Sequence, residues 1–172
     1  MKAFSGKKDL REATGAQQHQ GRDMKFKLEL PINKPQAEVW RLFDDFTNMQ
    51  KWQPSLIKVE RISGTAGQPG ATSKLTYKNG EREYSLFETV TFRAEPERLD
   101  GVYENEFAEN TVKNTFLEQG KDATIWKVEV IFKFKTLFMK VMGPLTKKNF
   151  VIRTQRDMER FRALAENSQM QE

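Results

Sequence analysis

The residue whose surroundings most suggest chemistry is Glu88, a carboxylate within the alternating segment Glu81–Phe92. Side chains of a strand alternate between its two faces. Glu88 therefore shares a predicted face with Arg82, Tyr84, Leu86, Val90 and Phe92. A carboxylate buried among apolar groups has a raised pKa, and such a group can anchor a ligand or act as a general acid or base. Two structural alternatives stay open: a β-bulge that turns Glu88 to water, or a basic partner such as Arg82.

Three further polar side chains are candidate anchors in a mostly apolar pocket: Tyr103, Asn105 and Asn114. The first two share a face of the predicted strand Leu99–Phe107, and the third lies in the predicted strand Thr111–Glu118. Glu88 with Tyr84 or Tyr103 is the one set that we expect to support acid–base chemistry. Alternatively, these polar groups satisfy one another's hydrogen bonds inside the core.

Apolar side chains are expected to line the rest of the pocket. Two candidates, Trp126 and Val130, lie on the inner face of the predicted strand Thr124–Lys135. Two more, Thr154 and Met158, lie on one stripe of the final helix. The candidates for the cavity mouth are Phe46, Trp52 and Lys147. For the two aromatic residues the alternative is plain packing where a helix meets a strand. For the lysine, it is a side chain that extends into water.

A single domain is predicted over residues 24–167. The polar stretch 1–23 lacks hydrophobic periodicity and the apolar segment of a secretory signal. Its part Ala13–Asp23 resembles an expression-tag leader, and the alternative is a native disordered tail. The only histidine, His19, lies there and receives no catalytic role. We also expect residues 168–172 to be disordered.

The elements that must position the candidate residues follow a simple order. An alternating strand, Lys25–Leu30, precedes two short helical segments that end at Trp52. Asn79-Gly80 is the strongest hairpin signal of the chain. Six further strands are predicted: Leu56–Ile62, Thr72–Lys78, Glu81–Phe92, Leu99–Phe107, Thr111–Glu118 and Thr124–Lys135.

The chain ends in one long amphipathic helix, which we expect to begin near Gly143-Pro144. A short turn or helix over Thr136–Met142 leads into it. Its apolar stripe comprises Phe150, Val151, Thr154, Met158, Phe161 and Ala165, with Leu164 at the edge. Arg153 is expected to project sideways or outward, and Leu145 and Ile152 lie opposite the stripe. Because this helix alone is long enough to cover a curved antiparallel sheet of about seven strands, the fold class is α+β with an internal cavity.

Composition excludes several classes of function. The 172 residues include no cysteine, so disulfides and thiolate metal sites are impossible. One histidine cannot build a catalytic triad or a histidine metal site, and we expect no metal and no cofactor. The net charge of +5 comes from basic residues that we read as interleaved with acids, so no nucleic-acid partner is expected. No apolar run approaches the ~20 residues of a membrane span, and we expect a cytoplasmic protein without stable membrane insertion.

Four motifs resemble the START / birch-pollen-allergen-like superfamily, abbreviated SRPBCC, over residues 24–167. Leu30–Trp40 is similar to its opening strand and first helix, and Phe46–Ser55 to its hinge-Trp-x-Pro passage. Arg93–Leu99 is similar to its turn before the fifth strand. Gly143–Glu166 resembles the closing helix of the polyketide cyclase/dehydratase-like branch. The resemblance implies the helix-grip fold, in which a curved sheet wraps a long C-terminal helix around a cavity.

Three functions follow from this reading, because one fold hosts many activities. The leading hypothesis is a module that binds a small hydrophobic molecule, such as a lipid, an isoprenoid or a polyketide, between sheet and helix. The second is a polyketide cyclase/dehydratase-type enzyme that uses Glu88 with a nearby tyrosine. The third is a protein-partner regulator such as a chaperone activator, which exposed Leu145 and Ile152 would favour. The oligomeric state is not indicated.

Overall fold

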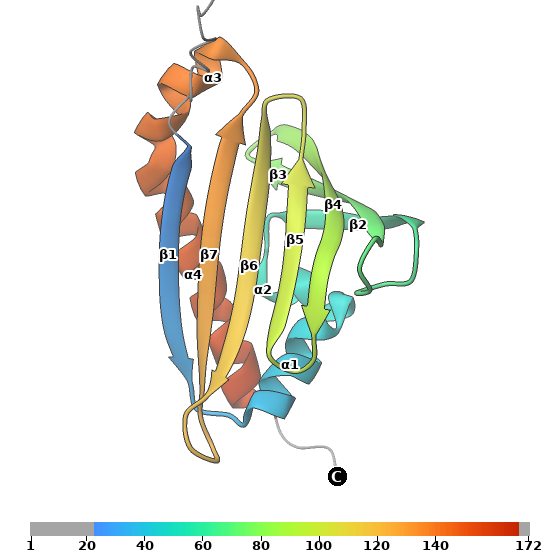
Figure 1. The fold of residues 1–172 in the computed structure, drawn as a ribbon, viewed down its shortest axis with the longest axis vertical. Helices are drawn as coiled ribbons and strands as arrows, with labels where there is room; N and C mark the ends of the chain where they lie inside the picture. Colours follow the sequence, from blue (N-terminus) through green and yellow to red (C-terminus); the bar gives the residue numbers. More distant parts are fainter. Residues whose placement is uncertain (1–22, 169–172) are drawn as a thin grey trace, which may run out of the picture.

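The computed structural model describes residues 23–168 and shows one curved antiparallel sheet of seven strands (Figure 1). The strands lie in the order β1-β7-β6-β5-β4-β3-β2. The first strand, β1, therefore pairs with the last strand, β7, and not with β2. The predictions made for residues 1–22 and 169–172 lie outside the described residues. The strands are β1 (Met24–Ile32), β2 (Leu56–Ser63), β3 (Thr72–Asn79), β4 (Arg82–Ala94), β5 (Arg98–Glu104), β6 (Ala108–Glu118) and β7 (Thr124–Phe134).

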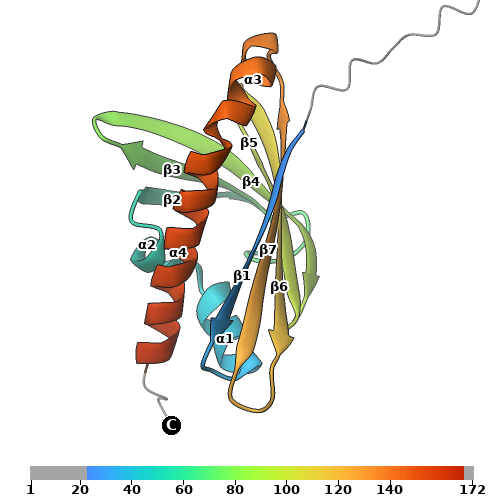
Figure 2. The ribbon, with the colours of Figure 1, turned by 90° about the vertical axis from the view of Figure 1, so that its left-hand side faces the viewer.

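The longest helix runs along the concave side of the sheet (Figure 2). The short helices follow β1 and β7: α1 (Gln36–Asp44), η1 (Phe46–Asn48), α2 (Met49–Trp52), α3 (Leu137–Met142) and η2 (Gly143–Thr146). The long helix α4 (Lys147–Asn167) completes the predicted α+β order, which the structure confirms. It begins later than expected because Gly143–Thr146 forms a tighter 3₁₀ turn. In the described part of the chain, no helix has the length and hydropathy to cross a membrane.

Alternation along the strands separates an apolar inner face from a charged outer face. In β7, every second residue from Thr124 to Phe134 is buried. On the outer face, Lys27 pairs with Glu129 at 2.8 Å, and Lys127 pairs with Glu29 at 3.0 Å. The period of two therefore sets which residues of β7 face α4.

An aromatic cluster packs between the short helices α1 and α2, the long helix α4 and the strands β6 and β7. The helix α1 lies at the lower end of the molecule in Figure 1. The Trp126 ring lies 5.1 Å from Phe161, 5.4 Å from Phe43 and 6.0 Å from Trp52, measured between ring centroids. Phe116 stacks on Trp126 at 5.9 Å. Perpendicular and offset contacts of this kind are the favoured arrangements of aromatic rings. This end of the core is tightly filled.

Packing loosens toward the upper end, where α3 lies. Along the inner side of α4, Met158 and Phe161 are buried, whereas Phe150, Val151 and Thr154 are only partly buried. The inner face of β6 follows the same gradient: Phe116 and Asn114 are buried, whereas Val112, Asn110 and Ala108 are only partly buried. These inward-facing side chains of β6 and of the first half of α4 remain partly accessible, while on β7 the ring of Phe132 packs on Phe150 at 4.7 Å between centroids.

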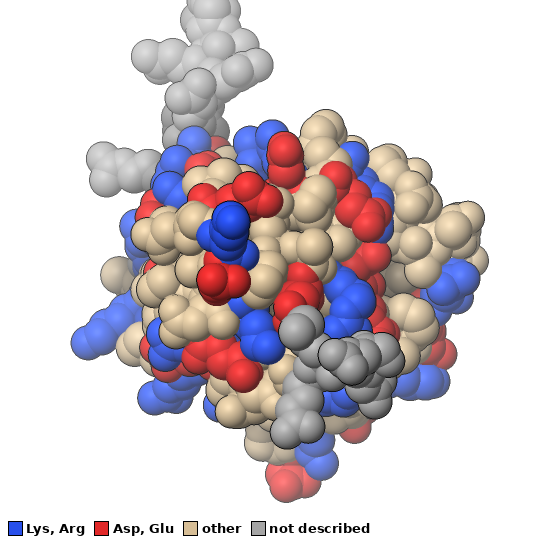
Figure 3. Space-filling model, turned by 90° about the horizontal axis from the view of Figure 1, so that it is seen from below, with Lys and Arg blue, Asp and Glu red and all other residues tan. Residues whose placement is uncertain are grey.

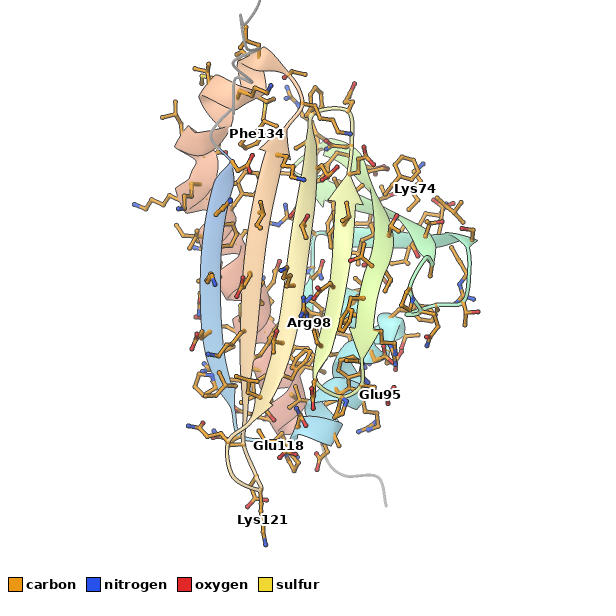
Figure 4. All side chains as sticks on the ribbon, viewed as in Figure 1. Lys74, Glu95, Arg98, Glu118, Lys121 and Phe134 are labelled. Atoms are coloured by element: carbon orange, nitrogen blue, oxygen red, sulfur yellow. The ribbon has the colours of Figure 1, made fainter. Side chains whose placement is uncertain are left out.

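A glycine sets the corner between α3 and η2. A Cβ atom on Gly143 would lie 2.2 Å from the ring of Phe134, so only a residue without a side chain fits there. Phe134 is the last residue of β7 and lies beside α3 in Figure 4. This contact holds the α3–η2 segment against the end of the sheet.

Candidate functional site

The candidate site is a polar row that crosses the inner face of the sheet at its loosely packed end. Strand register brings Ser73, Glu88, Tyr103, Asn110 and Phe132 side by side on five neighbouring strands. Four of these five side chains, all except Phe132, carry groups able to hold a polar ligand atom, and Glu88, Tyr103 and Asn110 lie on three adjacent strands. The structure therefore brings Glu88 and Tyr103 together, as the sequence predicts, and adds an asparagine.

Glu88 and Tyr103 form a hydrogen bond inside the protein. The Tyr103 hydroxyl donates to Oε1 of Glu88 at 2.7 Å. Burial raises the pKa of Glu88, and the hydrogen bond from Tyr103 opposes that shift. Burial also raises the pKa of Tyr103, and the nearby Glu88 carboxylate adds to the effect. Both shifts favour the protonated forms of the two groups, so the pair is suited to exchange a proton with a ligand.

Neither a bulge nor a basic partner accounts for Glu88, whereas its hydrogen bond with Tyr103 matches the alternative that the polar groups satisfy one another. A bulge is present in β4, but it falls between Val90 and Phe92, beyond the Glu88 position. It turns Phe92 to the outer face, where the side chain is exposed beneath the Arg98 guanidinium. The prediction that Phe92 shares the Glu88 face is therefore wrong. Arg82 is exposed, and the partner of Glu88 is Tyr103.

Asn110 is the residue that sequence reasoning missed. Its Oδ1 atom is buried and has no hydrogen-bond partner in the described part of the chain. The sequence predicts a strand that starts at Thr111, whereas β6 starts at Ala108. Extending the alternation of Val112 and Asn114 by one step would have placed Asn110 on the inner face. A buried acceptor without a partner costs free energy, so it stands out as a position where a ligand can donate.

A second polar group joins α4 to the sheet. Arg153 donates to the Tyr84 hydroxyl at 2.5 Å and to Ser55 Oγ at 2.7 Å. Its guanidinium also lies 5.3 Å from the ring centroid of Tyr77, which stacks on Tyr84. The prediction that Arg153 projects sideways or outward is wrong, because a long side chain can reach inward from the edge of a helical stripe. Tyr84 is thus held by Arg153.

The two other predicted anchors have structural partners. The prediction that Asn105 lies on the inner face is wrong, because β5 ends at Glu104. Its side chain instead accepts from the backbone N–H groups of Phe107 and Ala108, both at 2.9 Å, and closes the turn to β6. Asn114 is on the inner face, accepts from Trp126 Nε1 at 3.2 Å and donates to the Leu99 carbonyl at 3.3 Å.

The remaining predicted residues divide between core and surface. Trp126, Val130 and Met158 are buried in the main apolar cluster, and Thr154 lies partly buried on the inner side of α4. The prediction of Trp52 at a cavity mouth is wrong, because its ring packs between Phe43, Trp126 and Phe161. Phe46 and Lys147 are exposed.

Two hollows border α4. The first, of about 340 Å³, is lined by Pro54, Ser55, Asn149, Ile152, Arg153, Arg156, Asp157 and Arg160. The second, of about 450 Å³, is lined by Lys51, Arg160, Ala163, Leu164, Asn167 and Ser168. Neither includes a strand residue, so both lie outside the predicted cavity between the sheet and α4. Arg153 separates the first hollow from the stacked Tyr77 and Tyr84.

Among the described residues, no group of three acidic or histidine side chains is placed to hold a metal ion.

The buried carboxyl leads to a prediction about pH. The folded-state pKa of Glu88 is raised above its unfolded value of about 4.3. Stability is therefore lost as the pH rises from the unfolded pKa through the folded one. We expect Glu88→Gln, which keeps an acceptor for Tyr103, to unfold at higher denaturant concentration than wild type, by a margin that grows with pH.

The control is Glu129, whose pKa is lowered by its hydrogen bond from Lys27. Glu129→Gln should show the opposite sign, with relative stability falling as the pH rises. A lowered pKa changes stability only below the unfolded value of about 4.3, so urea unfolding of the three proteins between about pH 2.5 and about pH 8 measures both trends. A Glu88→Gln margin that stays constant over this range would show that the Glu88 carboxyl is not buried.

The sheet and α4 together define a helix-grip fold, and known structures share it. A START superfamily protein from Mycobacterium smegmatis superposes with a TM-score of 0.69 at 14% identity, covering 83% of this chain and 97% of that one. The Zhui aromatase/cyclase from Streptomyces sp. R1128 gives 0.69 at 12%, covering 84% and 94%. Norcoclaurine synthase from Thalictrum flavum, in complex with dopamine and hydroxybenzaldehyde, gives 0.64 at 14%, covering 87% and 90%. At these identities the likeness shows the fold alone.

A family model matches residues 23–166. The chain belongs to this family, Polyketide_cyc2, which is described as polyketide cyclase / dehydrase and lipid transport. The predicted SRPBCC membership and the helix-grip architecture are confirmed. No curated protein matches the chain.

Proposed function

We propose that this protein binds one small hydrophobic molecule with a polar group, between the upper half of the sheet and the first half of α4. One observation carries the proposal: Glu88, Tyr103 and Asn110 form a polar row on three adjacent strands of the inner face, and Asn110 Oδ1 has no partner among the described residues. Ligand sites commonly combine apolar walls with a few such polar groups. The family description and the partial burial of Phe150, Val151 and Thr154 support it.

The row also defines what it would recognise. Asn110 Oδ1 accepts a hydrogen bond, so the ligand supplies a hydroxyl or N–H donor. A protonated Glu88 can donate to a carbonyl, and burial raises its pKa in that direction. The apolar side chains around the row favour a neutral ligand. A hydroxylated lipid, isoprenoid or polyketide-like compound fits these requirements. The cytoplasmic location of the protein stays a prediction.

Titration with 1-naphthol, an apolar molecule with one hydroxyl donor, tests this site. Chemical-shift changes in ¹H–¹⁵N NMR spectra should concentrate at Tyr103, Asn110, Val112 and the start of α4. Naphthalene, which lacks the hydroxyl, is the matched ligand and should bind more weakly. Shifts confined to the outer face of the sheet, or equal affinity for both molecules, would count against the polar row as the binding site.

A second candidate function is an enzyme of the cyclase or dehydratase type. The observation that favours it is the 2.7 Å hydrogen bond between Tyr103 and a carboxyl whose pKa burial raises. Such a carboxyl can protonate a leaving hydroxyl and then act as a base. Tyr103 is the partner in this proposal, because Tyr84 is held by Arg153. Glu88→Gln would then retain ligand and lose turnover, whereas a pure carrier shows no chemical change in the extracted ligand.

A further inference from the structure

The helix α3 projects beyond the strands at the upper end of the molecule (Figures 1 and 2), and the α3–η2 segment carries exposed apolar side chains. No residue of α3 is buried. Leu137 is 80% exposed, Leu145 74% and Phe138 70%. We call this surface the apolar end, and its members are Leu137, Phe138, Val141, Met142 and Leu145. Contiguous exposed apolar side chains of this size mark interaction surfaces.

Along the sequence, the segment that carries the apolar end has charge of a single sign. Between Glu129 and Asp157 the sequence contains no acidic residue. It contains seven basic ones, Lys133, Lys135, Lys140, Lys147, Lys148, Arg153 and Arg156. The reading of basic residues as interleaved with acids is therefore wrong for this stretch. At the opposite end, seen from below in Figure 3, acidic and basic side chains are mixed.

Three of these lysines are available to a partner. Lys133 and Lys135 pair with Glu109 and Glu104. By contrast, Lys140, Lys147 and Lys148 are exposed, and none is ion-paired with a described carboxylate. They belong to the same α3–η2–α4 segment as the apolar end. An apolar patch is thus flanked by unpaired positive charge.

We propose that the apolar end docks on the surface of an anionic lipid bilayer. Interfacial segments combine apolar side chains that enter the acyl boundary with basic residues that meet anionic headgroups. Nucleic acid would match the lysines but leave five apolar side chains in water. A protein groove would match the apolar side chains but does not require the three unpaired lysines beside them. Only the lipid surface uses both features.

This inference goes beyond the proposed ligand site and does not depend on it. The apolar end and the proposed ligand site lie close together. Asn110 of the polar row is paired with Phe132, which is two residues from Phe134, and Phe134 contacts Gly143. A bilayer at this end would therefore face the loosely packed part of the interior. Vesicle binding and ligand binding remain separate measurements, so either proposal can fail alone.

Cosedimentation of the full chain with vesicles tests the docking surface. Wild type should sediment with phosphatidylcholine vesicles that contain phosphatidylserine, and much less with pure phosphatidylcholine. Lys147→Glu and Lys148→Glu should each weaken binding at least about fivefold, the contribution of one basic residue at an anionic surface. Phe138→Ser should weaken it on both charged and neutral vesicles, because it removes an inserted ring.

The matched controls lie elsewhere on the surface. Lys121→Glu changes a lysine of the β6–β7 loop at the lower end (Figure 4), and Phe87→Ser changes an exposed ring of β4. Both should bind like wild type. Wild type that stays in the supernatant, or variants that sediment equally well, would overturn the proposal. So would a wild-type dimer that Phe138→Ser converts to a monomer without any vesicle binding, which would make the surface a contact between copies of the chain.

Discussion

Trp126→Ala should lower the free energy of unfolding by about 3–5 kcal/mol, the usual cost of removing a buried tryptophan. The side chain is 2% exposed and lies among the rings of Phe43, Phe116 and Phe161. Its indole N–H also donates to Asn114, so the substitution both opens a cavity and removes a buried hydrogen bond. Urea denaturation monitored by far-UV circular dichroism measures the loss.

Phe87→Ala is the control for that loss. Phe87 is also an aromatic residue in a strand, but it is 50% exposed on the outer face. Its removal should cost less than about 1 kcal/mol, because the site does not form a cavity. A Trp126→Ala loss as small as that of Phe87→Ala would show that the aromatic cluster is not the core.

Asn110→Leu should weaken binding of 1-naphthol at least about fivefold, because the buried naphthol hydroxyl would lose its acceptor, which costs about 1–3 kcal/mol. The same substitution should stabilise the free protein, because it removes a buried acceptor that has no partner. Few substitutions are expected to lower binding and raise stability together. Weaker binding together with higher stability distinguishes a residue that binds a ligand from one that stabilises the fold. NMR titration gives the affinity, and urea denaturation gives the stability.

Asn114→Leu is the matched control on the same face of the same strand. Asn114 already accepts from Trp126 and donates to Leu99, so leucine would leave the buried indole N–H unpaired. This variant should therefore lose stability, by about 1–3 kcal/mol. Two asparagine substitutions that change stability in the same direction would contradict the distinction between them.

Periodicity predicted the architecture because strand and helix faces depend on local spacing alone. The alternation of β7 and the apolar stripe of α4 could be read directly, and each places its residues on the predicted side. The departures come from backbone details that spacing does not encode. One extra residue in β4 turned Phe92 outward, and the early end of β5 left Asn105 in a turn.

The candidate site was predicted only in part, for the same kind of reason. Glu88 and Tyr103 were both assigned to the inner face, but their contact depends on register between β4 and β5, which no single strand specifies. The sequence pattern does not indicate Asn110, because the strand that it predicts begins at Thr111, three residues after β6 begins. The inward turn of Arg153 depends on Tyr84 and Ser55, which lie far from it in the sequence.

Native mass spectrometry of the full chain, after exposure to a total lipid extract of cells, tests the binding proposal most directly. We predict a discrete added mass on a large fraction of the protein, released by organic solvent as an apolar compound with a hydroxyl or amide group. Asn110→Leu should carry less of it. A spectrum that shows only the mass of the bare polypeptide would contradict the proposal that this protein holds a small hydrophobic molecule.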